Sequence, residues 1–196
     1  SLFQDVSSEM LYPVLPLYLS SIGFSIALIG VLEGFAEATS GLSKGYFGKL
    51  SDITGKRLPF VQWGYALSTL GKTLMVLIAH PVWVFITRTM DRLGKGVRTS
   101  ARDAMLSDES TRETKGKVFG LHRAMDTLGA ALGPIIALIY LYYYPENYKT
   151  LFFLAFVPGV IAVLFTFFIR DQKRPSKEVK RGASFLSFLG YWKESP

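Results

Sequence analysis

Twelve ionisable side chains lie in stretches that are otherwise apolar, and they are the first chemical signal in this sequence. The acidic members are Asp5, Glu9, Glu33, Glu37, Asp91 and Asp126, and the basic members are Lys44, Lys72, Arg88, Arg92, Lys95 and Arg123. A charge exposed to lipid at mid-membrane costs about 2.5–3.5 kcal/mol, so a dozen would prevent insertion. We therefore expect the six acidic and six basic groups to face one another or water, although the spacing identifies no partner for Lys72.

Helical periodicity places these groups on common faces. At 100° per residue the stripes are Asp5 with Glu9, Glu33 with Glu37, Arg88 with Asp91 and Arg92, and His122 with Asp126. The first, second, fourth and fifth helical segments are therefore expected to surround a polar interior, with the third and sixth mostly outside. Ion pairs that only hold a bundle together are the alternative. A water-accessible pathway explains the whole set better, because apolar residues would pack such a bundle at less cost.

Two kinds of chemistry fit this interior. Carboxyl groups in a low-dielectric cavity are natural proton carriers, because desolvation disfavours their charged form. The candidates are Asp5, Glu9, Glu33, Glu37 and Asp126. Arginines can hold those carboxylates or bind an anionic substrate by bidentate hydrogen bonds, and here the candidates are Arg88, Arg92 and Arg123. Asp5 and Glu9 could instead bind a hard divalent cation, since carboxylates suit such ions and the sequence has no cysteine.

Six segments are long enough to position these groups across a bilayer. Residues 151–169 run without a charge, about 28 Å as a helix, which matches a hydrocarbon core of about 30 Å. The other five segments are residues 2–21, 25–47, 60–79, 82–104 and 117–144. The sequence therefore predicts an all-α membrane protein with six transmembrane helices in residues 1–169. Residues 170–196 are predicted to form a basic cytoplasmic linker with a short amphipathic helix.

The charge distribution supports this topology. Hydrophobic residues make up 49% of the 196 residues and charged residues 19%, and the net charge is +7. Most lysines and arginines fall on one side of the predicted spans, which marks that side as cytoplasmic. Both ends of the sequence are thus expected in the cytoplasm, in a bacterial inner membrane, and the positive charge reflects topology rather than nucleic-acid binding.

A first motif resembles a known family. The segment from Gly48 to Arg57 (GKLSDITGKR) is similar to the cytoplasmic loop between the second and third helices of the major facilitator superfamily, with Ile53 where a basic residue is usual. The matching positions are Gly48, Asp52, Gly55, Lys56 and Arg57. The resemblance implies a cytoplasmic latch between two six-helix halves, with Asp52 in the central role. Asp52 is expected just past a helix end, and Gly55 permits a tight turn.

A second motif lies on the fifth predicted helix. Gly120, Gly129, Gly133 and Pro134 resemble the antiporter motif of the same family, with Ala137 in place of a glycine. This likeness favours exchange or export. Of the family's fourth-helix motif, R-x-x-Q-G, only Arg88 is present, and the resemblance implies a role for it in proton relay. Glycine pairs Gly30/Gly34 and Gly41/Gly45 on the second helix predict close helix packing, and Gly133–Pro134 predicts a weak point in the fifth.

The resemblance implies that each half of the transporter contains two inverted three-helix repeats, so this sequence corresponds to one half of a twelve-helix protein. The other half would come from further residues, another chain or a second copy. We expect a secondary active transporter that uses alternating access, with proton-coupled antiport or export of a small molecule, a lipid bilayer around it and no resident cofactor. Transport of a divalent cation or an organic anion remains an alternative, as do a voltage sensor and a membrane receptor or structural protein. An enzyme with a Ser–His122 dyad is disfavoured, because no G-x-S-x-G sequence is present.

Overall fold

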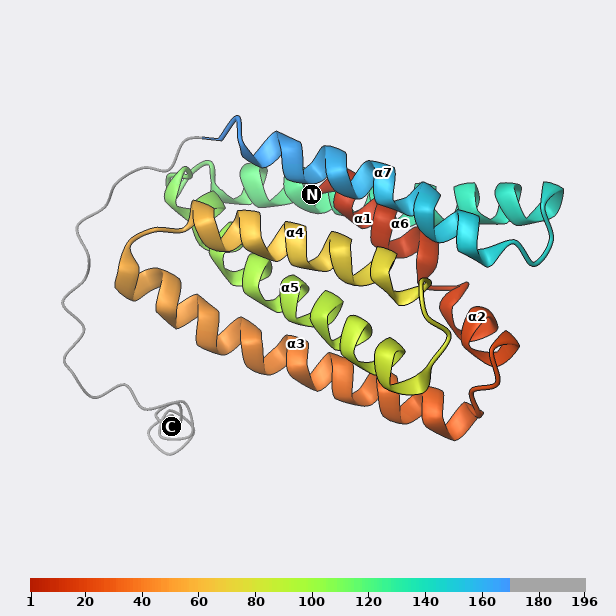
Figure 1. Cartoon of the computed structure of the whole chain (residues 1–196). Coiled ribbons are helices and arrows are strands. Elements are labelled where there is room, and N and C mark those ends of the chain that lie inside the picture. Colours follow the sequence, from red (N-terminus) through yellow and green to blue (C-terminus); the bar gives the residue numbers. More distant parts are fainter. Residues whose placement is uncertain (170–196) are drawn as a thin grey trace.

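The computed structural model describes residues 1–169, and within this range the chain is helical with no strand. The helices are α1 (Leu2–Leu11), α2 (Leu15–Ser21), α3 (Ile26–Thr54), α4 (Leu58–Met75), α5 (Pro81–Asp108), α6 (Lys115–Tyr143) and α7 (Tyr148–Thr166) (Figure 1). The predicted linker and amphipathic helix at 170–196 lie outside the described residues.

The first predicted span is broken into α1 and α2. Pro13 has no N–H to donate, and its ring would clash with the carbonyl of Glu9 in a continuous helix, so the chain turns at 12–14. Pro134 and Pro158, by contrast, lie inside α6 and α7, which remain single helices. The predicted weak point at Gly133–Pro134 therefore does not break α6.

Helix α3 is longer than its predicted span. It begins after Ser25, whose hydroxyl accepts a hydrogen bond from the Leu28 N–H at 3.2 Å. It ends at Gly55, which has a φ of 64°, in the left-handed region that glycine adopts without strain. Most of the segment from Gly48 to Arg57 is therefore the last two turns of a helix rather than a loop.

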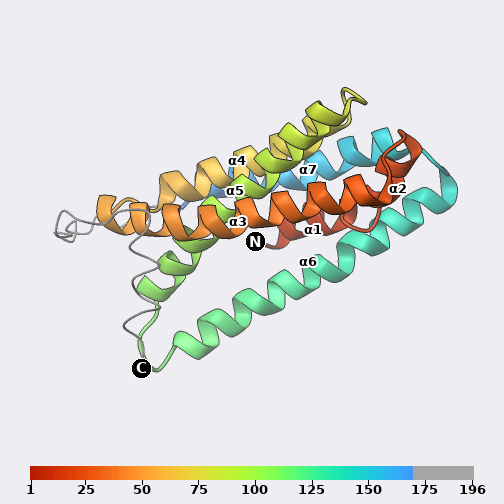
Figure 2. The same cartoon turned by 90° about the horizontal axis from the view of Figure 1, so that it is seen from below.

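The helices pack in a regular pattern of neighbours. Helix α5 lies between α3 and α4, α1 lies between α6 and α7, and α4 contacts α7 (Figures 1 and 2). If α1 and α2 are counted as one span, α1/α2 corresponds to α5, α3 to α6 and α4 to α7. Exchanging each helix with its counterpart leaves this set of contacts unchanged. The first and fourth predicted spans thus occupy equivalent central places.

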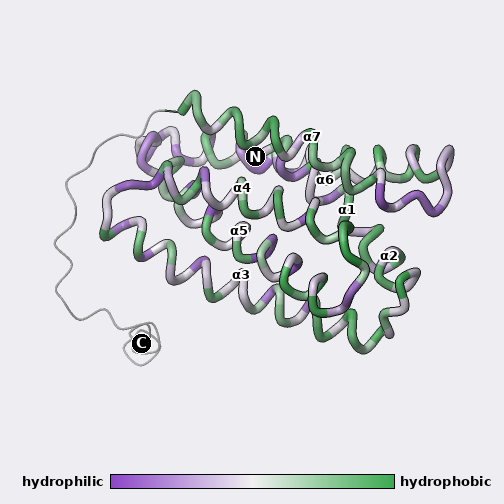
Figure 3. Tube along the Cα trace, in the orientation of Figure 1, coloured by the Kyte–Doolittle hydropathy of each residue, from purple (hydrophilic) through white to green (hydrophobic). Residues whose placement is uncertain are grey.

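Apolar packing closes both ends of the bundle, and polar side chains are buried between. One apolar cluster contains Met10, Leu19, Met75, Val84 and Phe152, and the other contains Val61, Tyr65, Ala101 and Ala162. Hydrophobic residues prevail along α7, whereas hydrophilic residues gather in the connections between helices (Figure 3). Among the described helices, α3, α6 and α7 are long and apolar enough to cross a membrane.

Glycines bring α4 and α5 into backbone contact. A Cβ added at Gly94 would lie 2.6 Å from the Ser68 nitrogen, and one at Gly71 would lie 2.7 Å from the Asp91 nitrogen. The α3 glycines, at 30, 34, 41 and 45, have no atom within 4 Å of such a Cβ, so the predicted close packing does not occur there within residues 1–169. The tight α4–α5 contact places Lys72 inside the bundle at 4% exposure. The third span, expected to lie mostly outside the polar interior, therefore reaches it through Lys72, the residue whose partner the sequence left open.

Candidate functional site

Arg88 on α5 is the centre of a buried ion network. Its Nε and Nη2 donate to the two carboxylate oxygens of Glu33 on α3 at 2.7 and 2.8 Å, and its Nη1 donates to Asp91 Oδ2 at 3.1 Å. The guanidinium side chain is 7% exposed, and Glu33 is 30% exposed. Two parallel N–H···O bonds to one carboxylate require the planar fork of arginine, so lysine could not replace this geometry.

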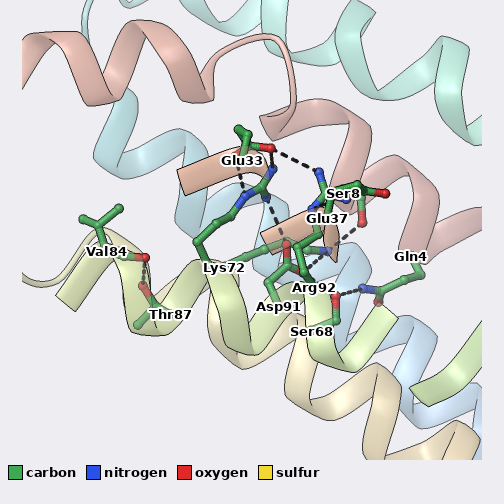
Figure 4. A network of polar contacts seen from close by, with 11 residues as sticks. Gln4, Ser8, Glu33, Glu37, Ser68, Lys72, Val84, Thr87, Asp91 and Arg92 are labelled. Carbon is green, nitrogen blue, oxygen red and sulfur yellow. Dashed lines mark hydrogen bonds and ion pairs between the residues drawn. The ribbon is translucent and has the colours of Figure 1, made fainter. Parts of the chain in front are cut away.

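Asp91 is the partner of Lys72 that the sequence did not identify, and it also connects Lys72 to Arg88. The Lys72 ammonium lies 3.9 Å from Asp91 Oδ1 and donates to the Ser8 hydroxyl at 2.7 Å. Ser68 also donates to Asp91 Oδ1, and Gln4 donates to Ser68 at 3.3 Å (Figure 4). The buried charges are thus hydrogen-bonded across α1, α4 and α5, as buried polar groups must be.

Sequence reasoning missed Gln4, Ser8 and Ser68 because it followed only charges. Their spacing contained a signal. Gln4 and Ser8 are four residues apart on α1, and Ser68 and Lys72 are four apart on α4, so each pair lies on one helix face.

Arg92 carries the network to an open cavity. Its Nη2 lies 3.6 Å from Glu33 Oε2, and its Nε lies 3.6 Å from Glu37 Oε2. The cavity has a volume of about 450 Å³ and lies between α1, α3 and α5. Its lining comprises Glu9, Tyr12, Glu33, Gly34, Glu37, Arg92 and Lys95. Within residues 1–169, the side chains of Glu9 and Lys95 form no hydrogen bond or ion pair, so both charged groups can contact a ligand in the cavity.

A second charged cluster lies around Asp5, one turn of α1 before Glu9. Asp5 Oδ1 is 3.9 Å from Arg98 Nη2, and Asp126 Oδ2 is 3.4 Å from His122 Nε2. Arg98 is 3% exposed and stacks over the Tyr65 ring, 4.8 Å from its centroid. The predicted single interior is therefore two clusters, and α1 contributes side chains to both.

Three predicted site residues do not lie as expected. Arg123 is exposed on α6 and joins neither cluster. Asp5 and Glu9 do not converge on one point, because Glu9 lines the cavity whereas Asp5 faces Arg98 and Asp126. Among the described residues, no three His, Cys, Asp or Glu side chains are grouped as a metal site would require.

The C-terminal end of α3 is held by Arg57. Its guanidinium lies 3.1 Å from Asp52 Oδ1 and 2.5 Å from Asp108 Oδ2 at the end of α5. Asp52 belongs to the last turns of α3, so the expectation that it lies past the helix end is wrong. Arg57 joins the ends of α3 and α5 at the start of α4.

The glycines of the second motif pack against α1. A Cβ at Gly129 would lie 2.8 Å from the Leu2 carbonyl oxygen, and one at Gly133 would lie 2.7 Å from the Met10 nitrogen. Gly120 has open space. Two of the three glycines thus allow α6 to approach the helix that carries Asp5 and Glu9.

Residues 1–195 match the Major Facilitator Superfamily. The chain belongs to this family of membrane transporters. It is 36% identical over 176 residues to an uncharacterised transporter of the family, MJ1317 from Methanocaldococcus jannaschii, a match that covers 90% of this chain and 44% of that protein. It is 29% identical to the transporter YqjV from Bacillus subtilis, covering 90% of this chain and 42% of the relative.

More distant matches agree on the fold. Citrate exporter 1 from Aspergillus niger is 22% identical over 84% of this chain and 31% of that protein. A crystal structure of a peptide transporter POT superposes with a TM-score of 0.76 at 16% identity, covering 98% of this chain and 41% of the other. The chain thus spans less than half the length of these relatives, which are transporters and not enzymes.

Proposed function

We propose that this chain is the six-helix half of a secondary active transporter that exports a small molecule in exchange for protons. The observation that carries the proposal is the ion network of Arg88 and Arg92 with Glu33 and Glu37, which lies at an open cavity between α1, α3 and α5. Buried charges of this kind in a transporter family mark a substrate or ion pathway.

The pattern of helix contacts supports two repeats and alternating access. The contacts of α1/α2, α3 and α4 correspond to those of α5, α6 and α7, as expected for three-helix repeats. Repeats of three spans run in opposite directions through the bilayer, because each span reverses the chain. We propose that six spans cross the inner membrane with both ends of residues 1–169 in the cytoplasm, and that a second six-helix half completes the cavity.

The carboxylate of Glu9 at the cavity supports antiport of a cargo with a positively charged group. Glu33, Glu37 and Asp91 balance Lys72, Arg88 and Arg92 in the network, so Glu9 and Lys95 are the charges left for a ligand. A cationic group would compete with a proton for Glu9 or Glu37. Competition for one carboxylate couples the two in opposite directions, which is the requirement for exchange.

A second candidate cargo is an organic anion, as the name of the Aspergillus relative suggests. Protonation of Glu33 would release Arg88 and Arg92 to bind a carboxylate of the cargo. In that case proton and cargo would bind together rather than compete, so they would move in the same direction. The direction of coupled proton movement therefore distinguishes the two cargo classes.

Proton flux in liposomes tests the proposal. The full-length protein is reconstituted with an internal pH dye, a pH gradient is imposed, and organic cations, citrate and divalent cations are added in turn. We expect at least one compound to drive proton movement opposite to its own, and we expect Glu37→Gln to reduce that movement at least tenfold. The matched control is Glu146→Gln, at an exposed loop residue outside both clusters. Cargo flux without proton movement, or flux equal in Glu37→Gln and wild type, would contradict proton coupling.

A further inference from the structure

The seam between α1 and α6 contains a pair of carboxyl groups that the cavity does not use. Asp5 on α1 and Asp126 on α6 lie next to each other across this seam. Gly129 makes this contact possible, because a Cβ there would lie only 2.9 Å from Asp5 Cβ. Their side chains are 20% and 19% exposed, so the pair is largely shielded from water.

Each carboxyl group uses one oxygen for a basic partner. Asp5 Oδ1 faces Arg98, and Asp126 Oδ2 faces His122. The two remaining oxygens, Asp5 Oδ2 and Asp126 Oδ1, are buried without any hydrogen-bond donor among the described residues. A buried acceptor without a donor costs about 1–3 kcal/mol, so two facing acceptors are an unfavourable arrangement unless a proton lies between them.

We infer that Asp5 and Asp126 bind one shared proton, and that this pair is a second proton-carrying site of the transporter beside the carboxylates of the cavity. The inference rests on the function proposed above for its role in transport, whereas the shared proton itself rests only on the geometry of the pair. One proton converts two facing acceptors into a donor and an acceptor, and it removes the repulsion between two like charges in contact.

The surroundings allow this site to load and release its proton. The charged or titratable side chains that face the pair are Arg98 and Arg102 on α5 and His122 on α6. Helix α7, which also packs on α1, contributes no charged side chain there. The basic groups stabilise the remaining negative charge, so the pair holds one proton rather than two.

The proton site lies close to the cavity along α1. Glu9 follows Asp5 by four residues, about 6 Å along the helix, and it points to the cavity rather than to the seam. When the proton leaves, two carboxylates face each other across the seam and push α1 away from α6. A shift of α1 moves Glu9 and Tyr12 with it, so loss of the proton at Asp5 also changes the cavity one turn further along α1.

Infrared spectroscopy and proton counting on the full-length protein test the shared proton without any substrate. The carbonyl band of a protonated carboxyl is followed between high and low pH in wild type, Asp5→Asn, Asp126→Asn and the double variant. We expect each single variant to lose the same band and one titrating proton, and the double variant to lose no more. The control Glu146→Gln should keep the band.

Two results would overturn the inference. One is that the single variants lose different bands and the double variant loses two protons, which means that the carboxyl groups titrate independently. The other is that neither variant changes the band. If the asparagine variants fail to fold, Asp126→Glu serves instead, because it keeps a carboxyl group and must shift the band. A protein that shows the shared proton but no proton-driven flux would refute the proposed function and leave the proton site intact.

Discussion

Removing the Arg88 guanidinium should destabilise the protein strongly, and the loss should depend on Glu33. Arg88 makes three charge-assisted hydrogen bonds, two to Glu33 and one to Asp91, from a side chain that is 7% exposed. Breaking a buried ion pair by removing one partner costs about 3–5 kcal/mol, since an uncompensated charge remains. We expect Arg88→Met to lower the free energy of unfolding by that amount.

Glu33→Gln should cost less, because Glu33 is 30% exposed and Arg88 keeps Asp91. Hydrogen bonds to charged groups contribute about 1.5–3 kcal/mol, which sets the expected loss. In the double variant Glu33 has already lost both hydrogen bonds to Arg88 and keeps only Arg92 at 3.6 Å, so its substitution should add much less than it costs in the wild type. The coupling free energy between the two substitutions should therefore be about 1.5–3 kcal/mol.

Denaturant unfolding of the full-length protein in detergent micelles measures all four corners of this cycle. Arg88→Met combined with Glu146→Gln is the control, and these two substitutions should be additive, because Glu146 lies in an exposed loop. A coupling below about 0.5 kcal/mol, the usual limit of additivity, would refute the view that Arg88 and Glu33 are one unit.

Three pairs of substitutions test the packing around the buried charges, again by denaturant unfolding. Gly94→Ala should cost about 1–3 kcal/mol, because its Cβ would meet the α4 backbone at 2.6 Å, whereas Gly116→Ala, with open space, should be neutral or stabilising; equal effects would contradict the close contact. Lys72→Met should cost about 3–5 kcal/mol by leaving Asp91 and Ser8 without their ammonium, and the exposed control Lys117→Met should stay within about 0.5 kcal/mol. Arg57→Gln should cost more than Asp52→Asn, because Arg57 also binds Asp108 and Asp52 is 56% exposed; the reverse order would show that Asp52 is the main tie.

Much of the charged interior could be predicted from the sequence, because membrane burial leaves few solutions for a charge. Helical spacing placed Arg88, Asp91 and Arg92 on one face, and all three are buried in one network. The tight turn at Gly55 was also predictable, because glycine adopts the left-handed conformation that ends α3 without strain.

The rest depended on contacts between helices that no periodicity contains. The partner of Lys72 is Asp91, on a different helix, and the pairing depends on Gly71 and Gly94 bringing α4 and α5 together. Asp5 and Glu9 share one stripe by spacing, yet they face two different clusters because α1 lies between α6 and the cavity. The glycine pairs of α3 looked like packing sites but meet nothing within residues 1–169.

Alternating access to the cavity is the central claim, and labelling a cysteine inside it is the most direct test. Gly34 lines the cavity and has room for a larger side chain, so Gly34→Cys is introduced into full-length protein free of other cysteines. We predict that a membrane-impermeant thiol reagent labels it from either face, in right-side-out and in inverted vesicles. Leu70→Cys, on the outward side of α4, should react from neither. Labelling of Gly34→Cys from one face only, under every pH and cargo condition, would contradict alternating access.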